Sequence, residues 1–324
     1  MANEGLEILP FYSLSDSQLN NFLRLDHQDI LFQNNILSDY LRNIDCVSLL
    51  DELNFGYVTD LEFNNKVQSL VSRIELSVLH LNIRSLNCNH LALCQFLELL
   101  VVKFDVIVLS EIWVTNIDCY HNIIPGYSFH YDLPKDSRVG GVGMFINNNF
   151  TQTVIFDYKI QNCPENQVEN IWLMITKNGK SYIVAGIYRH PNQNHSEFTS
   201  SMENVLGKIS NQDLPCIIAG DLNIDLSKCD SNKSTAEYVD NLLTNNFMPV
   251  IVMPTQITSH SVFLIDHIYY FESPKNKHTL QVKSGNFLED ISDHLQHVGP
   301  MCSCSTGSDS TSTLQHTRVA TCWT

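Results

Sequence analysis

The sequence lacks an excess of positive charge. Lys and Arg together number 19, against 35 Asp and Glu, and the formal net charge is −16. This balance argues against a protein that coats nucleic acid through bulk electrostatic attraction. An enzyme that contacts only a few phosphates stays compatible with it, because carboxylates that hold metal ions are themselves acidic.

The sequence also lacks paired cysteine motifs, a secretory start and a long apolar run. Its ten cysteines are scattered, which argues against a zinc ribbon and favours free thiols. The N-terminus has no basic start followed by an apolar run, so no secretory signal is indicated. The most apolar stretch, Leu97–Leu109, is interrupted by Glu98, Lys103 and Asp105, which disfavours a membrane span. We therefore expect an intracellular protein.

Three regions differ in character. Residues 1–75 are rich in Asn, Asp and Leu and are expected to form a helical or partly disordered leader. Residues 76–298 alternate compact apolar runs with amphipathic stretches, which predicts a folded domain. Residues 299–324 are divergent and rich in Ser and Thr, and we expect a disordered tail.

The middle region predicts an α+β fold. Short β-branched or aromatic-rich runs bounded by turn residues predict strands over Leu76–Asn82, Asp105–Ser110, Val142–Ile146, Ile171–Ile175, Tyr182–Tyr188, Cys216–Gly220 and Leu264–Tyr270. Helical spacing predicts helices over Leu91–Lys103, Ser196–Ser210 and Thr235–Asn245, with Ser196 and Ser234 as N-caps of the last two. Many strands with few helices favour two packed sheets covered by helices.

Polar side chains, most of them acidic or amide, recur at the ends of these predicted strands and in the SDH motif. They are Asn82, Glu111, Tyr188, Asp221, Asn223, Asp266, Asp293 and His294. Taken singly, most have ordinary explanations, such as a turn residue for Asn82 or a core aromatic for Tyr188. Asp266 is different, because burying a carboxylate inside an apolar strand without a partner is costly. As an ordered set they predict one shared cleft, because rigid strands can aim their terminal side chains at a common point.

The set suits phosphodiester cleavage. A hard cation such as Mg²⁺ prefers oxygen ligands, and Glu111 with the Asn82 amide oxygen fits that role. A histidine held by a carboxylate can orient and deprotonate water, and His294 with Asp266 could form that pair. Asp221 could place the water.

Two neutral donors could complete this chemistry. Asn223 and the Tyr188 hydroxyl could stabilise the pentacovalent phosphate without adding negative charge. The remaining histidines that we considered, His27, His80, His90 and His195, are interpreted as surface or core residues.

The motifs LHLNIRSL, LSEIWV, RVGGVGMFI, GIYRHPN, GDLNIDL, LIDHIYY and ISDH follow one another over residues 76–296. In this order they resemble the endonuclease domain of non-LTR (LINE-type) retrotransposons. That domain belongs to the endonuclease/exonuclease/phosphatase superfamily, with abasic-site endonucleases, pancreatic-type DNases, inositol-phosphate phosphatases and sphingomyelinases. The resemblance implies a four-layer α/β-sandwich, in which two mixed sheets pack face to face with helices outside.

The resemblance also implies residue roles. Asn82 and Glu111 would hold Mg²⁺, or Mn²⁺ as the alternative ion, with Asp293 beside it. Tyr188 and Asn223 would contact the scissile phosphate, and Asp266 would hold His294. The general base stays open between Asp221 and His294. Substrate contacts are expected from Arg138 and Arg189, and the family's hydroxyl residue before the IDH strand corresponds to Thr258, Ser259 or Ser261.

The chain departs from the family after the SDH motif. The sequence LQHVGPMCSCSTGSDSTST is expected to break the last core strand and to weaken the site that it supports. The reverse transcriptase expected downstream is absent, which favours a truncated element copy. The leading hypothesis is a monomeric, Mg²⁺-dependent DNA endonuclease, nuclear if functional, that nicks target DNA for retroelement insertion. The alternatives are a phosphatase or phospholipase of the same fold and a catalytically dead remnant.

Overall fold

The computed structural model describes residues 54–134, 138–160, 168–258, 260–273, 280–288, 291–299 and 303–304. A seven-stranded sheet has the order β1-β15-β16-β2-β3-β5-β4. Its strands are β1 (Asn54–Val58), β15 (Ser284–Phe287), β16 (Gln296–Gly299), β2 (Val78–Asn82), β3 (Val106–Ser110), β5 (Val142–Asn147) and β4 (Tyr127–Asp132). The sheet is mixed, because the pairs β1/β15 and β2/β3 are parallel and the other pairs are antiparallel.

A six-stranded sheet packs against the first and has the order β10-β13-β9-β8-β7-β6. Its strands are β10 (Phe247–Pro249), β13 (Asp266–Phe271), β9 (Cys216–Asp221), β8 (Lys180–Arg189), β7 (Val168–Lys177) and β6 (Thr151–Val154). Only β8 and β9 are parallel within it. Two small pairs are β11 (Gln256–Ile257) with β12 (Val262–Phe263), and β14 (Leu280–Gln281) with β17 (Ser303–Cys304).

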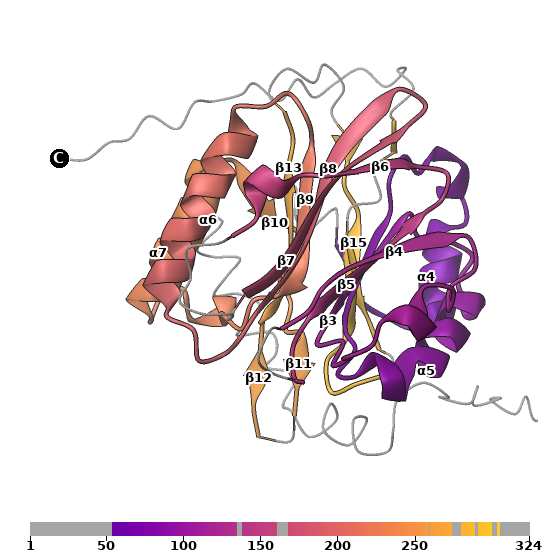
Figure 1. Cartoon of the computed structure of the whole chain (residues 1–324), viewed down its shortest axis with the longest axis horizontal. Coiled ribbons are helices and arrows are strands. Elements are labelled where there is room, and N and C mark those ends of the chain that lie inside the picture. The colour runs from indigo at the N-terminus through magenta and orange to yellow at the C-terminus, as the bar shows by residue number, and fades with distance from the viewer. Residues whose placement is uncertain are drawn as a thin grey trace, which may run out of the picture.

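Helices cover the outer faces of both sheets (Figure 1). They are α4 (Asp60–Val67), α5 (Leu86–Leu99), α6 (His195–Ser210) and α7 (Lys233–Thr244), with 3-10 turns η1 (Val71–Arg73), η2 (Asp118–Tyr120), η3 (Phe156–Tyr158) and η4 (Leu226–Lys228). The helices α4 and α5 lie on the seven-stranded sheet, and α6 and α7 lie on the six-stranded sheet. The predicted four-layer sandwich is confirmed.

The apolar residues of β3 show how the layers are built. Val106 and Val108 belong to the core between the two sheets, whereas Ile107 and Leu109 belong to the core beneath α5. Alternate residues of a strand point to opposite faces, so a strand buried on both faces has a continuous apolar run. This explains why the run DVIVLS is recognisable without any alternation of polar residues.

The predicted N-caps Ser196 and Ser234 are wrong by two positions. Asn194 caps α6 and Asn232 caps α7, and each amide oxygen accepts backbone N–H groups two and three residues later. Asparagine and serine are similarly good N-caps, so residue preference alone does not choose between neighbouring candidates.

The segment before residue 76 contributes to the fold. Strand β1 pairs in parallel with β15, and α4 buries Phe63 and Val67. Thr59 and Glu62 form a capping box, which satisfies the first free N–H groups of α4. The strand in this segment was not indicated by its sequence, and residues 1–53 of the predicted leader lie outside the described part of the chain.

The expected break of the last core strand is wrong. Gln296–Gly299 forms β16, which lies between β15 and β2 and is buried throughout. Backbone hydrogen bonds of a ladder do not depend on side-chain type, so polar residues are tolerated where their side chains find partners. Asn286 provides one, because its Oδ1 lies 3.1 Å from Nδ1 of His297. The site therefore keeps its supporting strand.

Two expectations from composition concern the whole chain. Among the described cysteines, Cys88, Cys94, Cys119, Cys216 and Cys229 are free thiols, as expected. No helix in the described part of the chain combines the length and apolar character that a membrane span requires.

Candidate active site

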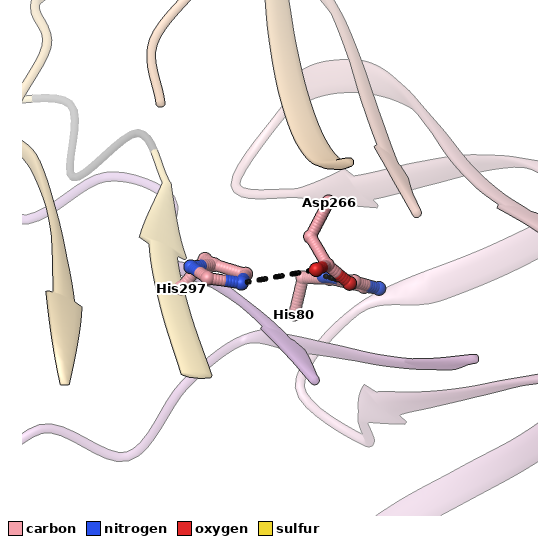
Figure 2. Close-up of side chains that lie close together, drawn as sticks. All are labelled: His80, Asp266 and His297. Carbon is pink, nitrogen blue, oxygen red and sulfur yellow. Dashed lines mark ion pairs between the residues drawn. The ribbon is translucent and has the colours of Figure 1, made fainter. Parts of the chain in front are cut away.

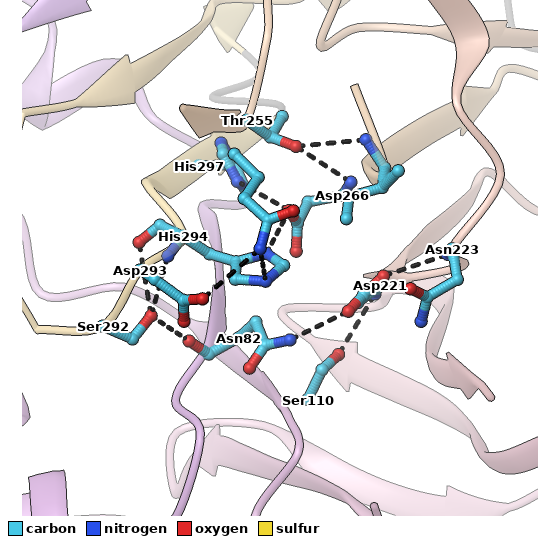
Figure 3. A network of polar contacts seen from close by, with 12 residues as sticks. Asn82, Ser110, Asp221, Asn223, Thr255, Asp266, Ser292, Asp293, His294 and His297 are labelled. Atoms are coloured by element: carbon cyan, nitrogen blue, oxygen red, sulfur yellow. Dashed lines mark hydrogen bonds and ion pairs between the residues drawn. The ribbon is translucent and has the colours of Figure 1, made fainter. Parts of the chain in front are cut away.

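The strand registers bring the predicted polar residues to one edge of the sandwich. In the six-stranded sheet, Asp221 at the end of β9 lies opposite Tyr188 of β8 on one side and Asp266 of β13 on the other. In the seven-stranded sheet, Asn82 at the end of β2 lies opposite Ser110 at the end of β3. The strand ends of the two sheets bring these side chains close together (Figure 3).

Asp221 joins the two sheets. Its Oδ2 accepts a hydrogen bond from Nδ2 of Asn82 at 2.8 Å, and its backbone N–H donates to Oγ of Ser110 at 3.1 Å. Its Oδ1 accepts from the backbone N–H of Asn223 at 3.0 Å. Burial, reinforced by the charge of Asp266, raises the pKa of Asp221 to about 8. A carboxyl with such a pKa can take up a proton near neutral pH.

Asp266 and His294 form a buried ion pair. Nδ1 of His294 lies 2.8 Å from Oδ2 of Asp266, and the two side chains are 6% and 0% exposed. Burial, the largest single effect, would lower the pKa of His294, but the charge and hydrogen bond of Asp266 together with the charges of Asp221 and Asp293 raise the pKa to about 10. Burial would likewise raise the pKa of Asp266, but the charge and hydrogen bond of His294 together with His297 and His80 hold it below its usual range.

This pair makes a testable contribution to stability. A raised pKa means that the folded protein holds the His294 proton more tightly than the unfolded chain, so the stabilisation is full below about pH 6.5 and is lost as pH rises through about 10. We expect the stability difference between wild type and His294→Gln, measured by urea unfolding in chelator, to shrink from about pH 6 to about pH 10. A difference that grows with pH would contradict the ion pair.

The candidate metal ligand Glu111 stands at the end of β3 in the left-handed region, with φ at 55°. Its Oε1 accepts a hydrogen bond from the Tyr188 hydroxyl at 3.2 Å. Burial, together with the charge of Glu111, raises the pKa of Tyr188 well above its usual range, so the phenol remains a proton donor. This backbone conformation is unusual for a residue other than glycine, and it accompanies the contact of the Glu111 carboxylate with the Tyr188 hydroxyl.

The Arg84 side chain is a cation that interacts with the carboxylates of both Asp293 and Glu111. The Arg84 guanidinium is 2.5 Å from Oδ2 of Asp293, and its pKa is raised by that bond first and by Glu111 to a lesser degree. Oδ1 of Asp293 is buried and has no hydrogen-bond partner among the described residues. Oxygen donors with a strong negative field fit a divalent cation. Arg84 itself was not predicted.

A second group of possible metal ligands lies nearby and is buried. Ligand atoms of Asp221, Asp266 and His294 are all within 4.8 Å of one another. This buried set adjoins the predicted ligand set, because Asn82 contacts Asp221. The predicted set consists of Asn82, Glu111 and Asp293. The site residues therefore fit a divalent metal, and the choice between the sets stays a prediction.

Of the two predicted substrate-binding arginines, Arg189 is contradicted by its position. Its side chain is fully buried, and its Nη1 donates to the backbone carbonyls of His190 at 2.9 Å and Gln193 at 3.3 Å. The guanidinium lies over the ring of Phe198, 5.8 Å from the centroid. It holds the backbone behind the site because a buried guanidinium must satisfy its donors. Arg138 is exposed, and its substrate contact stays a prediction.

Asn223 is held in place by its neighbours. Its Nδ2 donates to the backbone carbonyl of Arg189 at 2.8 Å, and its backbone is in the left-handed region with φ at 48°. The loop after β9 is thereby fixed against the end of β8. The backbone N–H of Asn223 contacts Asp221 and its side-chain amide is held at the end of β8, while its contact with phosphate stays a prediction.

Besides Arg84, three further polar residues of the site were not predicted. The Ser110 hydroxyl holds Asp221, the Thr255 hydroxyl accepts from the backbone N–H of Asp266 at 3.1 Å, and Nε2 of Gln256 lies 3.0 Å from Nε2 of His294. A polar residue that closes an apolar strand was the available signal for Ser110. Thr255 and Gln256 lie in a segment whose fold depends on tertiary contacts, so no local signal marks them.

The hydroxyl candidates before the IDH strand take other positions. Thr258 and Ser261 pair with each other at 2.7 Å across the β11–β12 turn, and Ser259 lies outside the described residues. The hydroxyl that contacts the start of β13 is that of Thr255, which accepts from the N–H groups of both Ile265 and Asp266.

Two mixed sheets with carboxylates and a histidine gathered at their strand ends define a hydrolase that acts on phosphoester bonds and uses a divalent metal. The sequence from residue 79 to residue 294 matches the endonuclease/exonuclease/phosphatase family. This match covers two thirds of the chain, and the chain belongs to that family. No curated protein sequence matches the chain.

Solved structures of this fold support the architecture. The endonuclease domain of TRAS1, a telomere-specific non-LTR retrotransposon, is 13% identical with a TM-score of 0.50, covering 70% of this chain and 97% of that domain. TDP2 of D. rerio, complexed with a single-strand DNA product, is 18% identical with a TM-score of 0.51, covering 71% and 99%. The mannosyl-6-phosphatase of Bacteroides thetaiotaomicron is 15% identical with a TM-score of 0.51, covering 69% and 98%. At these identities the likeness shows the fold alone.

Proposed function

We propose that this protein is a divalent-metal-dependent DNA endonuclease that nicks target DNA for retroelement insertion. One observation carries the proposal: Asn82, Asp221, Asp266 and His294, from both sheets, meet in one buried hydrogen-bonded network. Such a network would hold a general base, the protonated His294 ring and an amide donor in fixed positions. In-line attack of water on a phosphodiester requires groups placed in this way.

The pKa directions favour Asp221 as the general base. A base works best when its pKa lies near the operating pH, and the pKa of Asp221 is raised to about 8. The pKa of His294 is raised to about 10, so its imidazole is protonated at neutral pH and suits stabilisation of the phosphate charge. Asp266 keeps the His294 ring oriented through Nδ1.

The remaining residues bind and orient. Glu111, Asn82 and Asp293 would hold Mg²⁺, or Mn²⁺ in its place, and the ion would neutralise charge on the phosphate and the leaving oxygen. The Tyr188 hydroxyl and the Asn223 amide would donate hydrogen bonds to phosphate oxygens without adding negative charge. Arg84, half-exposed beside Asp293, is positioned to exchange that carboxylate for a phosphate oxygen.

DNA is the favoured substrate because the motifs GIYRHPN and LIDHIYY resemble the retroelement branch of the family. A solved structure of D. rerio TDP2, which has the same fold, is complexed with single-strand DNA product. The second candidate is a phosphomonoesterase, since a mannosyl-6-phosphatase also shares the fold. The intact β16 removes the main argument for a dead remnant.

Nicking of supercoiled plasmid by the purified full chain tests the proposal. With Mg²⁺, we expect conversion to open circles, and Glu111→Gln should slow it by about 10²-fold or more because metal charge stabilisation is worth several kcal/mol. His294→Ala should slow it by about 10²–10⁴-fold. The control Glu237→Gln, at an exposed position on α7, should leave the rate unchanged.

Two other results would overturn the proposal. Phosphate release from inositol or sugar phosphates, without plasmid nicking, would establish the phosphomonoesterase. Neither activity, in a chain with a folded circular dichroism spectrum, would establish a catalytically dead remnant.

A further inference from the structure

A second cluster of ionisable side chains shares Asp266 with the active site. His80 of β2, Asp266 of β13 and His297 of β16 point toward one another between the two sheets (Figure 2). Nδ1 of His80 is 3.9 Å from Oδ1 of Asp266, and Nε2 of His297 is 3.9 Å from Oδ2. All three side chains are fully buried.

The facing atoms of this cluster have no hydrogen-bond partner among the described residues. They are Nδ1 of His80, Oδ1 of Asp266 and Nε2 of His297. Leaving a buried polar atom unsatisfied costs about 1–3 kcal/mol, so three at one point are unexpected in a stable core. Two imidazole nitrogens and a carboxylate oxygen that converge without hydrogen-bond partners indicate that a ligand binds between them.

The far nitrogen of each imidazole is held from behind. Nε2 of His80 lies 3.0 Å from the Ser110 hydroxyl, and Nδ1 of His297 lies 3.1 Å from Oδ1 of Asn286. Histidines that bind metals usually have their second nitrogen held in this way, which fixes the ring and directs the free nitrogen at the ion. Burial also lowers the pKa of His80 to about 4, so its ring is neutral at physiological pH, as a ligand must be.

We propose that His80, Asp266 and His297 form a binding site for a divalent transition-metal ion of the zinc class. Two imidazoles with one carboxylate suit Zn²⁺, Co²⁺ or Ni²⁺, whereas Mg²⁺ and Ca²⁺ prefer oxygen ligands alone. This site shares no ligand with the predicted magnesium site of Asn82, Glu111 and Asp293.

The ligand spacing allows such an ion after a small closure. Two ligands on a tetrahedral zinc with bonds of about 2.1 Å lie about 3.4 Å apart. The observed separations of 3.9 Å, from His80 to Oδ1 and from His297 to Oδ2 of Asp266, must shorten by about 0.5 Å, and the two nitrogens, which lie within 4.8 Å of each other, must also approach. Small adjustments of all three side chains are therefore required. A water molecule would bridge the same atoms without any movement, and it is the competing occupant.

An ion at this site would affect the active site through Asp266, which belongs to both. Asp266 orients His294, and the ion would bind the same carboxylate. If the proposed nuclease activity holds, micromolar Zn²⁺ should inhibit Mg²⁺-dependent nicking at least 10-fold. His297→Val should remove most of that inhibition relative to the same variant without Zn²⁺, because it removes one ligand of the ion.

Cobalt binding tests the site without relying on activity. The full chain is stripped of metal with chelator and titrated with Co²⁺, whose visible absorption reports coordination by protein nitrogen ligands. We expect one Co²⁺ per chain, displaced by Zn²⁺ and not by Mg²⁺. His297→Val should weaken this binding at least 10-fold, whereas Glu111→Gln, in the predicted magnesium site, should leave it unchanged.

His297 is buried, so His297→Asn serves as a second variant that keeps a polar side chain near Asn286. Both variants must show a folded circular dichroism spectrum, and at least one folded variant must lose the Co²⁺ band for the site to stand. No Co²⁺ binding in wild type, or binding that survives in the folded variants, would overturn the proposal and leave a buried water as the occupant. Loss of nicking activity alone would count against the nuclease proposal and not against this site.

Discussion

Replacing Asp266 by alanine is expected to lower the free energy of unfolding by about 3–5 kcal/mol, because removal of one partner from a buried ion pair leaves the other charge uncompensated. Asp266 is fully buried, accepts from His294 at 2.8 Å and is held by the Thr255 hydroxyl through its backbone. Phosphodiester cleavage should fall by at least about 10²-fold, since the His294 ring loses its orienting partner.

Urea unfolding followed by circular dichroism, in chelator and near neutral pH, measures the first effect, and plasmid nicking measures the second. Asp266→Asn keeps the shape and one acceptor oxygen, so its stability loss should be smaller than that of Asp266→Ala. Glu111→Gln separates the two effects. Within the described residues, partly exposed Glu111 has one side-chain hydrogen bond, from Tyr188, and weakening it should cost about 1 kcal/mol or less. Wild-type stability in Asp266→Ala would refute the buried pair.

Replacing Gly220 by alanine is expected to destabilise the protein by about 3 kcal/mol or more, because overpacking against backbone has no cheap relief. A Cβ at Gly220 would lie 1.8 Å from the carbonyl oxygen of Ile187 in the neighbouring strand β8. The strand β9 can make room only by moving away from β8, which breaks their parallel ladder. Asp221, the next residue, would move with it, so activity should fall as well.

Gly207→Ala is the matched control. Gly207 lies within α6, and its nearest contact for an added Cβ is Oδ1 of Asn245 at 4.0 Å. Alanine in a helix interior is favoured over glycine, so this change should stabilise the protein by about 0.5–1 kcal/mol. Thermal unfolding of the two variants beside wild type checks both signs. A Gly220→Ala protein that melts like wild type would contradict the close approach of β8 and β9.

Much of the fold was predictable because its strands are locally distinct. Each run of buried β-branched residues between turn signals became a strand in the structure, including β3, β8 and β9. The order of the motifs was sufficient to identify the family, since those motifs lie at the ends of these strands. The N-caps, by contrast, were placed two residues late, because Asn194 and Asn232 compete with serines of nearly equal preference.

The errors share a physical cause. Strand β16 forms despite Gln296 and His297 because its ladder to β15 and β2 supplies the backbone hydrogen bonds. Arg189 is buried because its guanidinium donates to the backbone carbonyls of His190 and Gln193 and reaches that of Asn223, in the loop after β9, while it lies over the ring of Phe198. Neither environment is visible in the local sequence, where a polar residue after an apolar run predicts exposure.

The sequence by itself determined the central strands β2, β3, β5, β7, β8, β9 and β13, the helices α6 and α7, and the acidic, amide and histidine residues from which the site is built. Only the tertiary structure decided how these residues pair: Asn82 with Asp221, Thr255 with Asp266, and His80 with His297 around one carboxylate. The reason is that periodicity and turn preference act over a few neighbouring residues. The hydrogen bonds of the site instead join strands from two sheets, and their geometry exists only after those sheets have packed.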